Sequence, residues 1–188
     1  MTAIIDGYLT GQLLVAMPAM DDPRFERSVI YMCAHSSAGA LGLIINRLAD
    51  HISFSELLGQ LGIAAAPSQE IRVHVGGPVE QARGFVLHSA DYVRETTLVV
   101  SEEIALTASM DVLAAIAAGN GPRRSLLALG YAGWAAGQLE SEIQANGWLQ
   151  APADEDLLFG QNVDGKWHGA IRKIGLDLSA LSSAAGHA

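Results

Sequence analysis

Short apolar segments alternate with polar loops in the first part of the chain, and their lengths are typical of β-strands. The segment from Gln12 to Met17 ends at Pro18, because proline donates no hydrogen bond to a neighbouring strand and restricts the residue before it. Residues 28–35 and 40–45 are apolar on both faces, which is typical of interior strands. The short polar turn between them predicts an antiparallel hairpin.

Further strands are predicted where short apolar segments are bounded by glycine, proline or polar residues. Residues 71–75 alternate between apolar and polar side chains, which indicates a strand with one covered face. The Gly76-Gly77-Pro78 segment that follows lacks the lysine and the helix of a phosphate-binding loop, so we interpret it as a tight turn rather than an anion-binding nest. The other predicted strands span residues 84–88, 97–100 and 125–130.

Apolar residues at helical spacing predict four helices. The first begins after Ser53, which can form a capping box with Glu56. The third is expected to turn a polar face to solvent. That face consists of Gln138, Glu140, Glu142 and Asn146. The predicted helices span residues 54–61, 110–118, 133–145 and 166–174.

The order of these elements favours one fold class. Strands occur in clusters as well as in alternation with helices, which favours a mixed α/β (α+β) fold with helices packed on a mixed sheet. A chain of 188 residues is most simply one compact domain, spanning residues 1–188, and can bury roughly 70% of its extended surface. Its 50% hydrophobic and 16% charged residues exclude a disordered chain. Residues 179–188 are small and polar and are expected to fray.

The chain is acidic, with a formal net charge of -9. Such a protein repels phosphate backbones on average, so we expect neither direct nucleic-acid binding nor binding to an anionic membrane. Cys33 is the single cysteine, which excludes an intrachain disulfide and a multi-thiolate zinc site. The N-terminal segment lacks the pattern of a signal peptide, and no apolar stretch approaches the ~20 residues that cross a bilayer. We therefore predict a cytoplasmic protein.

The loop of residues 18–27 contains the densest set of charged side chains. Asp21 and Asp22 are adjacent carboxylates, which can bind a hard metal ion or act as an acid/base pair. Arg24 and Arg27 lie within six residues of them and can offset their charge through ordinary ion pairs. We favour the structural interpretation and predict no metal site.

Polar residues also close the predicted strands. Cys33 and His35 share one strand face and could form a nucleophilic pair, although an apolar strand favours an inert thiol. Asn46 is either a turn residue or a polar anchor in a cleft, and the hairpin places it near the first loop, at the end opposite His35. We take Asp21, Arg27, His35 and Asn46 as the candidate binding cleft. No catalytic set and no cofactor are predicted, because the common hydrolase, dinucleotide and zinc motifs are absent.

A set of motifs is spread in order over nearly the whole chain: AMPAMD (16–21), FERSVIY (25–31), His35, GALGLIINR (39–47), GGPV (76–79), RGFVLH (83–88), GYAGW (130–134), GQLE (137–140), EIQAN (142–146) and Trp148. Together these segments resemble the YqgE/AlgH family. Leu48 departs from the family pattern, which usually has proline after the Asn-Arg or Asn-Lys pair. The resemblance implies a bacterial cytosolic α/β protein with a branched sheet folded into a pseudo-barrel. It also implies a transcriptional-regulator label without an agreed set of catalytic residues.

Three functions are open at this point. The first is a non-enzymatic regulatory or binding protein with a protein or small-molecule partner held at the first loop and Asn46. The second is a small-molecule or metal-dependent enzyme that uses Asp21, Asp22, Arg27, His35 and Asn46. The third, direct DNA binding, follows the family label but opposes the net charge. We favour the first.

Overall fold

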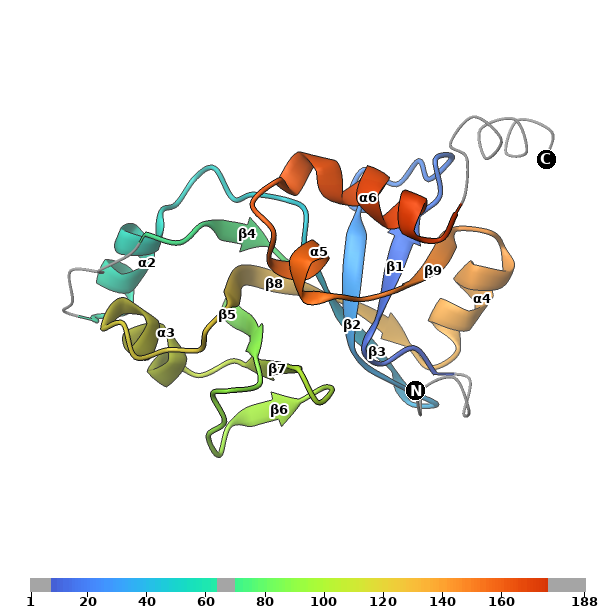
Figure 1. Ribbon diagram of the computed structural model, residues 1–188. Coiled ribbons are helices and arrows are strands. Elements are labelled where there is room, and N and C mark those ends of the chain that lie inside the picture. The colour runs from blue at the N-terminus through green and yellow to red at the C-terminus, as the bar shows by residue number, and fades with distance from the viewer. Residues whose placement is uncertain (1–7, 64–69, 176–188) are drawn as a thin grey trace.

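The computed structural model describes residues 8–63 and 70–175 (Figure 1). Nine strands form one sheet in the order β6-β7-β5-β8-β3-β2-β1-β9, with β4 paired to β8 beside this path. The predicted hairpin is present, because β2 and β3 pair antiparallel. The strands are β1 Gln12–Ala16, β2 Val29–Ser36, β3 Gly39–Ile44, β4 Val73–Val75, β5 Val79–Ser89, β6 Thr97–Val99, β7 Ile104–Thr107, β8 Ser125–Ala135 and β9 Trp148–Pro152.

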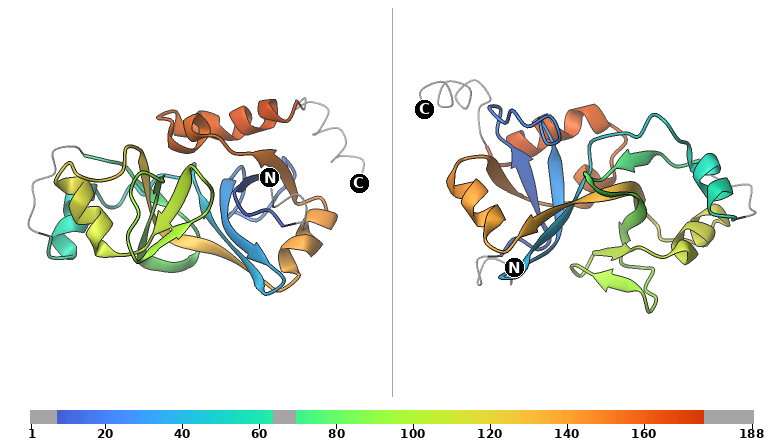
Figure 2. Two further views of the ribbon diagram at one scale, coloured as in Figure 1. Left: turned by 60° about the horizontal axis from the view of Figure 1, so that its bottom comes forward. Right: turned by 180° about the vertical axis from the view of Figure 1, so that it is seen from behind.

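The long strand β8 is the branch point of the sheet. Its first part lies between β5, which pairs antiparallel to it, and β4, which pairs parallel to it. Its last four residues pair with β3 instead. The sheet therefore splits at β8 and curls into a half-barrel (Figure 2), and the predicted mixed α/β fold with a branched sheet is confirmed.

Five α-helices pack around the described part of the sheet. Figure 1 shows α2 and α3 at one end of the molecule beside β4 and β5, and α4 at the opposite end beside β9. The predicted cap of α2 is present, because the Ser53 hydroxyl accepts a 3.1 Å hydrogen bond from the Glu56 N–H. The helices are α2 Phe54–Gln60, α3 Met110–Ala117, α4 Gln138–Gln144, α5 Glu155–Phe159 and α6 Lys166–Lys173, with a 3₁₀ turn at Val163–Gly165.

Helix α6 covers one face of the curled sheet. It contacts β1, β2 and β9 and buries Trp167, Ala170 and Ile171 against them. The Trp167 Nε1–H donates a 2.9 Å hydrogen bond to the carbonyl oxygen of Ala16, at the end of β1. A separate apolar cluster lies under α2 and α3. The core under α6 is therefore separate from the core under α2 and α3.

Some sequence predictions were wrong. The helix predicted over residues 133–145 begins only at Gln138, because residues 133–135 continue β8 and pair with β3. Gly137, with φ +77°, separates the strand from the helix. The short elements β7, β9 and α5 were not predicted. The fraying expected for residues 179–188 lies outside the described residues.

The Gly76-Gly77-Pro78 segment is a close crossing of two backbones. The Gly76 N–H donates to the carbonyl oxygen of Leu129, and the Ile44 N–H donates to that of Gly76, both at 2.8 Å. A side chain at Gly77 would overlap the main chain of Tyr131 in β8, and Gly130 faces the same crossing. The glycines therefore let the chain cross directly over β8 from β4 to β5, and the structure shows this crossing where the sequence predicted a tight turn.

We expect Gly77→Ala to destabilise the fold by about 3 kcal/mol or more, because main chain on both sides of the crossing would have to move. Gly59→Ala is the matched control, because Gly59 lies in α2 with open space around it. There the same substitution should stabilise the fold by about 0.5–1 kcal/mol. Urea denaturation curves give both values. Equal effects of the two substitutions would contradict the crossing.

Candidate functional site

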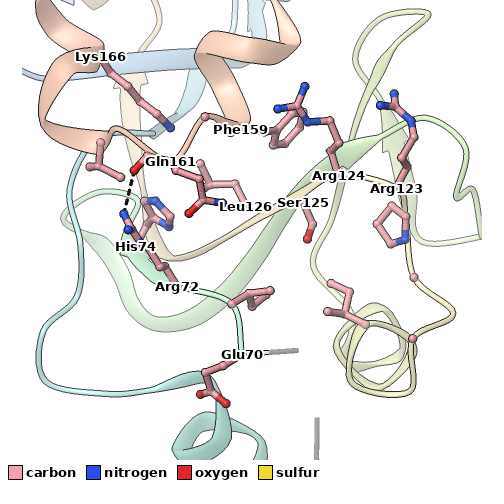
Figure 3. Close-up of a pocket in the computed structure, with 17 residues that line it drawn as sticks. Glu70, Arg72, His74, Arg123, Arg124, Ser125, Leu126, Phe159, Gln161 and Lys166 are labelled. Carbon is pink, nitrogen blue, oxygen red and sulfur yellow. Dashed lines mark hydrogen bonds between the residues drawn. The ribbon is translucent and has the colours of Figure 1, made fainter. Parts of the chain in front are cut away.

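A cavity of about 390 Å³ lies between the β4 strand, the start of β8 and the segment from α5 to α6 (Figure 3). Four cationic side chains and one histidine reach it from three separate parts of the chain. Among the described residues that line it, Glu70 is the one carboxylate. The cationic residues are Arg72, Arg123, Arg124 and Lys166, and the histidine is His74. A cationic cavity in a chain of net charge -9 is the most distinctive chemistry of the structure.

The two arginines at the start of β8 are neutralised by neighbouring carboxylates. Arg123 donates to both carboxylate oxygens of Glu155 at 3.0 Å, and Arg124 donates to Asp156 at 3.1 Å. The Glu70 carboxylate is also occupied, because it accepts hydrogen bonds from the main chain and the hydroxyl of Ser55. This part of the cavity therefore carries little uncompensated charge.

Arg72 and Lys166, in contrast, are bound only by main-chain carbonyls. The Arg72 guanidinium donates to the Gln161 carbonyl at 3.0 Å. The Lys166 ammonium donates to the carbonyls of Ile45 at 3.0 Å and Leu158 at 2.7 Å. Within residues 8–63 and 70–175, no ion pair joins either cation to a carboxylate. Lys166 is buried, so its charge is balanced by main-chain dipoles, whereas Arg72 is exposed to solvent.

Burial determines the protonation of this end of the cavity. Lys166 is only 3% exposed, and burial, assisted by the nearby Arg72 charge, lowers its pKa to about 8. Burial, assisted by the Lys166 charge, lowers the pKa of His74 to about 4, so His74 is neutral at pH 7. Between pH 8 and 10.5 the unfolded chain binds more protons at Lys166 than the folded chain. This group therefore makes the free energy of unfolding rise with pH in that window.

The residues predicted from the first loop lie near one another but are largely occupied. The Asp22 carboxylate accepts hydrogen bonds from the side chain and main chain of Arg24, which is the structural ion pair that the sequence favoured. The Asn46 Oδ1 accepts from the Val29 N–H, and its Nδ2 donates to the Arg27 carbonyl, both at 2.9 Å. Asp21 is exposed on the same loop.

The structure does not bring His35 to this loop. It lies at the opposite end of β2, where Nδ1 accepts from the Leu9 N–H at 3.0 Å and Nε2 donates to the Glu140 carboxylate at 3.1 Å. Neighbouring Cys33 is buried, and burial raises the pKa of its thiol to about 12, as expected for an inert cysteine. The predicted four-residue cleft is therefore divided between two ends of the hairpin.

The comparisons with known proteins are consistent across sequence and structure. A family model described as AlgH-like matches residues 13–179. The chain belongs to the AlgH-like family. This AlgH-like protein is 58% identical over 190 residues to a UPF0301 protein of Afipia carboxidovorans, covering 96% of this chain and 90% of the relative. It is 55% identical to a UPF0301 protein of Rhodospirillum rubrum, covering 97% and 96% of the two chains.

Two solved structures share the fold. The AlgH protein of Pseudomonas aeruginosa superposes with a TM-score of 0.79 at 45% identity, covering 93% of each chain. A protein of Corynebacterium diphtheriae superposes with a TM-score of 0.73, covering 93% of this chain and 91% of that one, but its 22% identity shows the fold alone. In residues 8–63 and 70–175 of the AlgH-like protein, no helix has the length and apolarity to cross a membrane.

The predicted polar face of α4 is solvent-exposed at Gln138 and Asn146, but the partly buried Glu142 on that face is structural. The Glu142 carboxylate accepts from the indole N–H groups of Trp134 at 3.1 Å and Trp148 at 2.9 Å, and from the Gln138 amide at 2.9 Å. Phe25 packs against both indole rings, which fixes the first loop to the sheet. The AlgH-like segment from Trp134 to Trp148 thus holds α4 and β9 together.

Sequence reasoning missed Lys166 and Arg72 as site residues. Lys166 was assigned only to the start of a helix, and Arg72 only to the polar face of a strand. The one sequence feature that could have drawn attention to Lys166 is the scarcity of lysine, because the chain contains only two lysines. Lys166 also directly precedes Trp167, a predicted core residue. Nothing in the sequence shows that Arg72 and Lys166 lie beside the same cavity.

We expect Asn46→Ala to destabilise the AlgH-like protein by about 1–3 kcal/mol, because it leaves the Val29 N–H and the Arg27 carbonyl without their partner. Asp21→Ala is the control on the same loop and should change stability by less than about 0.5 kcal/mol, since Asp21 is exposed. Thermal unfolding followed by circular dichroism gives the comparison. Equal stability of the Asn46 variant and the wild type would contradict the anchoring role.

Proposed function

We propose that this AlgH-like protein is a non-enzymatic regulatory binding protein of the cytoplasm, and that its ligand is a small anion held by Lys166 and Arg72. The observation that carries this proposal is the buried Lys166 ammonium and the solvent-exposed Arg72 guanidinium, each bound by main-chain carbonyls, at the wall of a partly open cavity. The cavity volume of about 390 Å³ falls in the range of small-molecule sites.

The energetics favour an anionic ligand. Removing an ammonium from water is costly, and two carbonyl acceptors offset only part of that cost. A phosphate or carboxylate group between Lys166 and Arg72 would supply the missing opposite charge through charge-assisted hydrogen bonds. The lowered pKa of Lys166 supports this view, because it reports that the charged form lacks a counter-ion.

The cavity also suggests where the rest of the ligand lies. Arg123 and Arg124 are already paired with Glu155 and Asp156, so the anionic group is assigned to the Lys166 end. Leu126 and Phe159 line the cavity and offer apolar contact to the remainder of the ligand. A bound ligand would bridge β4 and the α5–α6 segment, which offers a route from ligand binding to a regulatory change.

The other two functions have less support. An enzyme at the first loop would need Asp22 and Asn46, but both are engaged in hydrogen bonds within the loop and hairpin, and His35 lies at the other end of β2. Direct DNA binding would place a polyanion against an acidic chain.

Titration calorimetry at pH 7 and low salt, with inorganic phosphate and with succinate as probes, tests the proposal. We expect binding of at least one probe. Lys166→Met and Arg72→Ala should each weaken binding about ten-fold or more, because each removes a charge-assisted hydrogen-bond donor.

Arg172→Ala is the matched control, because Arg172 is exposed on α6 and is not among the residues that line the cavity. It should leave the affinity unchanged within about two-fold. Circular dichroism confirms that each variant is folded. Failure of both probes to bind at millimolar concentration, or equal loss in all three variants, would overturn the proposal.

A further inference from the structure

We propose that Lys166 is a covalent attachment site for a small carbonyl compound that also carries a phosphate or carboxylate group, joined through a reversible imine. This inference rests on the proposed anion site and names the class of ligand that it takes. Its basis is the hydrogen bonding of the Lys166 nitrogen at the cavity wall, together with the adjacent guanidinium of Arg72.

The two carbonyl acceptors suit a neutral amine. A neutral lysine has two N–H groups and one lone pair, whereas an ammonium has three N–H groups and no lone pair. The carbonyls of Ile45 and Leu158 accept two N–H groups, so the neutral amine is fully satisfied as a donor and retains its lone pair. Figure 3 shows the Lys166 side chain extending from α6 into the cavity, towards His74.

The surroundings also make the neutral form accessible. Burial and the Arg72 charge lower the pKa of Lys166 to about 8, so a substantial fraction of the amine is deprotonated slightly above neutral pH. Lysines desolvated beside another cation are a known way to obtain nucleophilic amines. No carboxylate in the described part of the chain pairs with Lys166 to restore its charge.

Arg72 supplies the specificity for an anionic ligand. It donates to Gln161 through Nη1, which leaves further N–H groups of the planar guanidinium for a phosphate or carboxylate. That contact would hold the carbonyl carbon beside the Lys166 nitrogen and raise its effective concentration. A neutral aldehyde would gain no such contact.

The covalent step is a condensation. The lone pair of the neutral Lys166 nitrogen attacks the carbonyl carbon and forms a C–N bond, while the carbonyl π electrons move to oxygen. One proton then passes from the nitrogen to that oxygen. The resulting carbinolamine loses its hydroxyl group together with the remaining nitrogen proton as water, and the nitrogen lone pair forms the C=N bond. Amine and carbonyl compound thus give imine and water, with no oxidant or reductant required.

The sequence provides an internal control, because the chain contains two lysines only. Lys173 is the other lysine; it lies in the last turn of the same helix and forms an ion pair with Asp154. An adduct on Lys166 and not on Lys173 would therefore report the cavity rather than the general reactivity of amines.

The test uses pyridoxal 5′-phosphate, an anionic aldehyde, and pyridoxal, its counterpart without phosphate. Each is incubated with the full chain, the imine is trapped by borohydride reduction to a secondary amine, and peptide mass spectrometry locates the adduct. We expect one adduct, on Lys166, formed at least about ten-fold faster with pyridoxal 5′-phosphate than with pyridoxal. Inorganic phosphate should slow it by competition.

Variants separate the covalent step from anion binding. Lys166→Arg keeps a cation but has no primary amine and should give no adduct, and Arg72→Ala should slow labelling about ten-fold. Arg172→Ala should label like the wild type. Labelling of Lys173 or the N-terminal amine at the rate of Lys166, or equal rates with both aldehydes, would overturn the inference. If phosphate binds in calorimetry but Lys166 is not labelled, the covalent step fails and the anion site stands; if neither occurs, both fail.

Discussion

The placement of the Lys166 ammonium against two main-chain carbonyls is the constraint on which the candidate site depends. One carbonyl belongs to Ile45, just after β3, and the other to Leu158 in α5, so a single nitrogen ties the helical segment to the sheet. Such a contact satisfies two of the three N–H groups of the ammonium and leaves its charge without a counter-ion. A neutral hydrogen-bond donor would be enough to link α6 to the carbonyls of Ile45 and Leu158. The presence of a cationic lysine at this position is therefore our reason to expect an anionic ligand.

The branched sheet makes this arrangement possible. Strand β8 pairs with β4 and β5 in its first part and with β3 in its last part, and the cavity forms a hollow beside β4. The crossing of Gly76 and Gly77 over β8 fixes the exit of β4 from that hollow. The α5–α6 segment then covers it, anchored by the hydrogen bond from Trp167 to Ala16. The crossing over β8 and the hydrogen bond from Trp167 to Ala16 therefore support both the fold and the walls of the cavity.

Much of the fold could be predicted from sequence because its signals are local. The stop at Pro18, the hairpin and the Ser53 cap each depend on a few consecutive residues, and the structure confirms them. Residues 133–135 were misassigned because Trp134 fits an inward position in either a strand or a helix, and the pairing with β3 decides for the strand. Short strands such as β7 and β9 contain too few residues to show a recognisable alternation of apolar and polar side chains.

The candidate site was harder to predict for a physical reason. The proximity of Asn46 to Arg27 follows from hairpin geometry and was predicted, whereas the partners of Lys166 are main-chain atoms of apolar residues, which have no chemical signature in a sequence. One of them, Ile45, lies 121 positions away. The net charge of the chain was also misleading, because a total of -9 gives no indication of a local cluster of cationic residues around one cavity.

The central claim is that Lys166 carries a buried charge without a carboxylate partner. The most direct measurement is an NMR titration of the lysine side-chain nitrogens, with the Lys166→Met variant identifying the signal among the two lysines of the chain. The account predicts a pKa of about 8 for Lys166, below the ordinary lysine value of 10.5, and a rise of that pKa when phosphate is bound. A Lys166 signal that titrates at or above 10.5 in the free protein would contradict it.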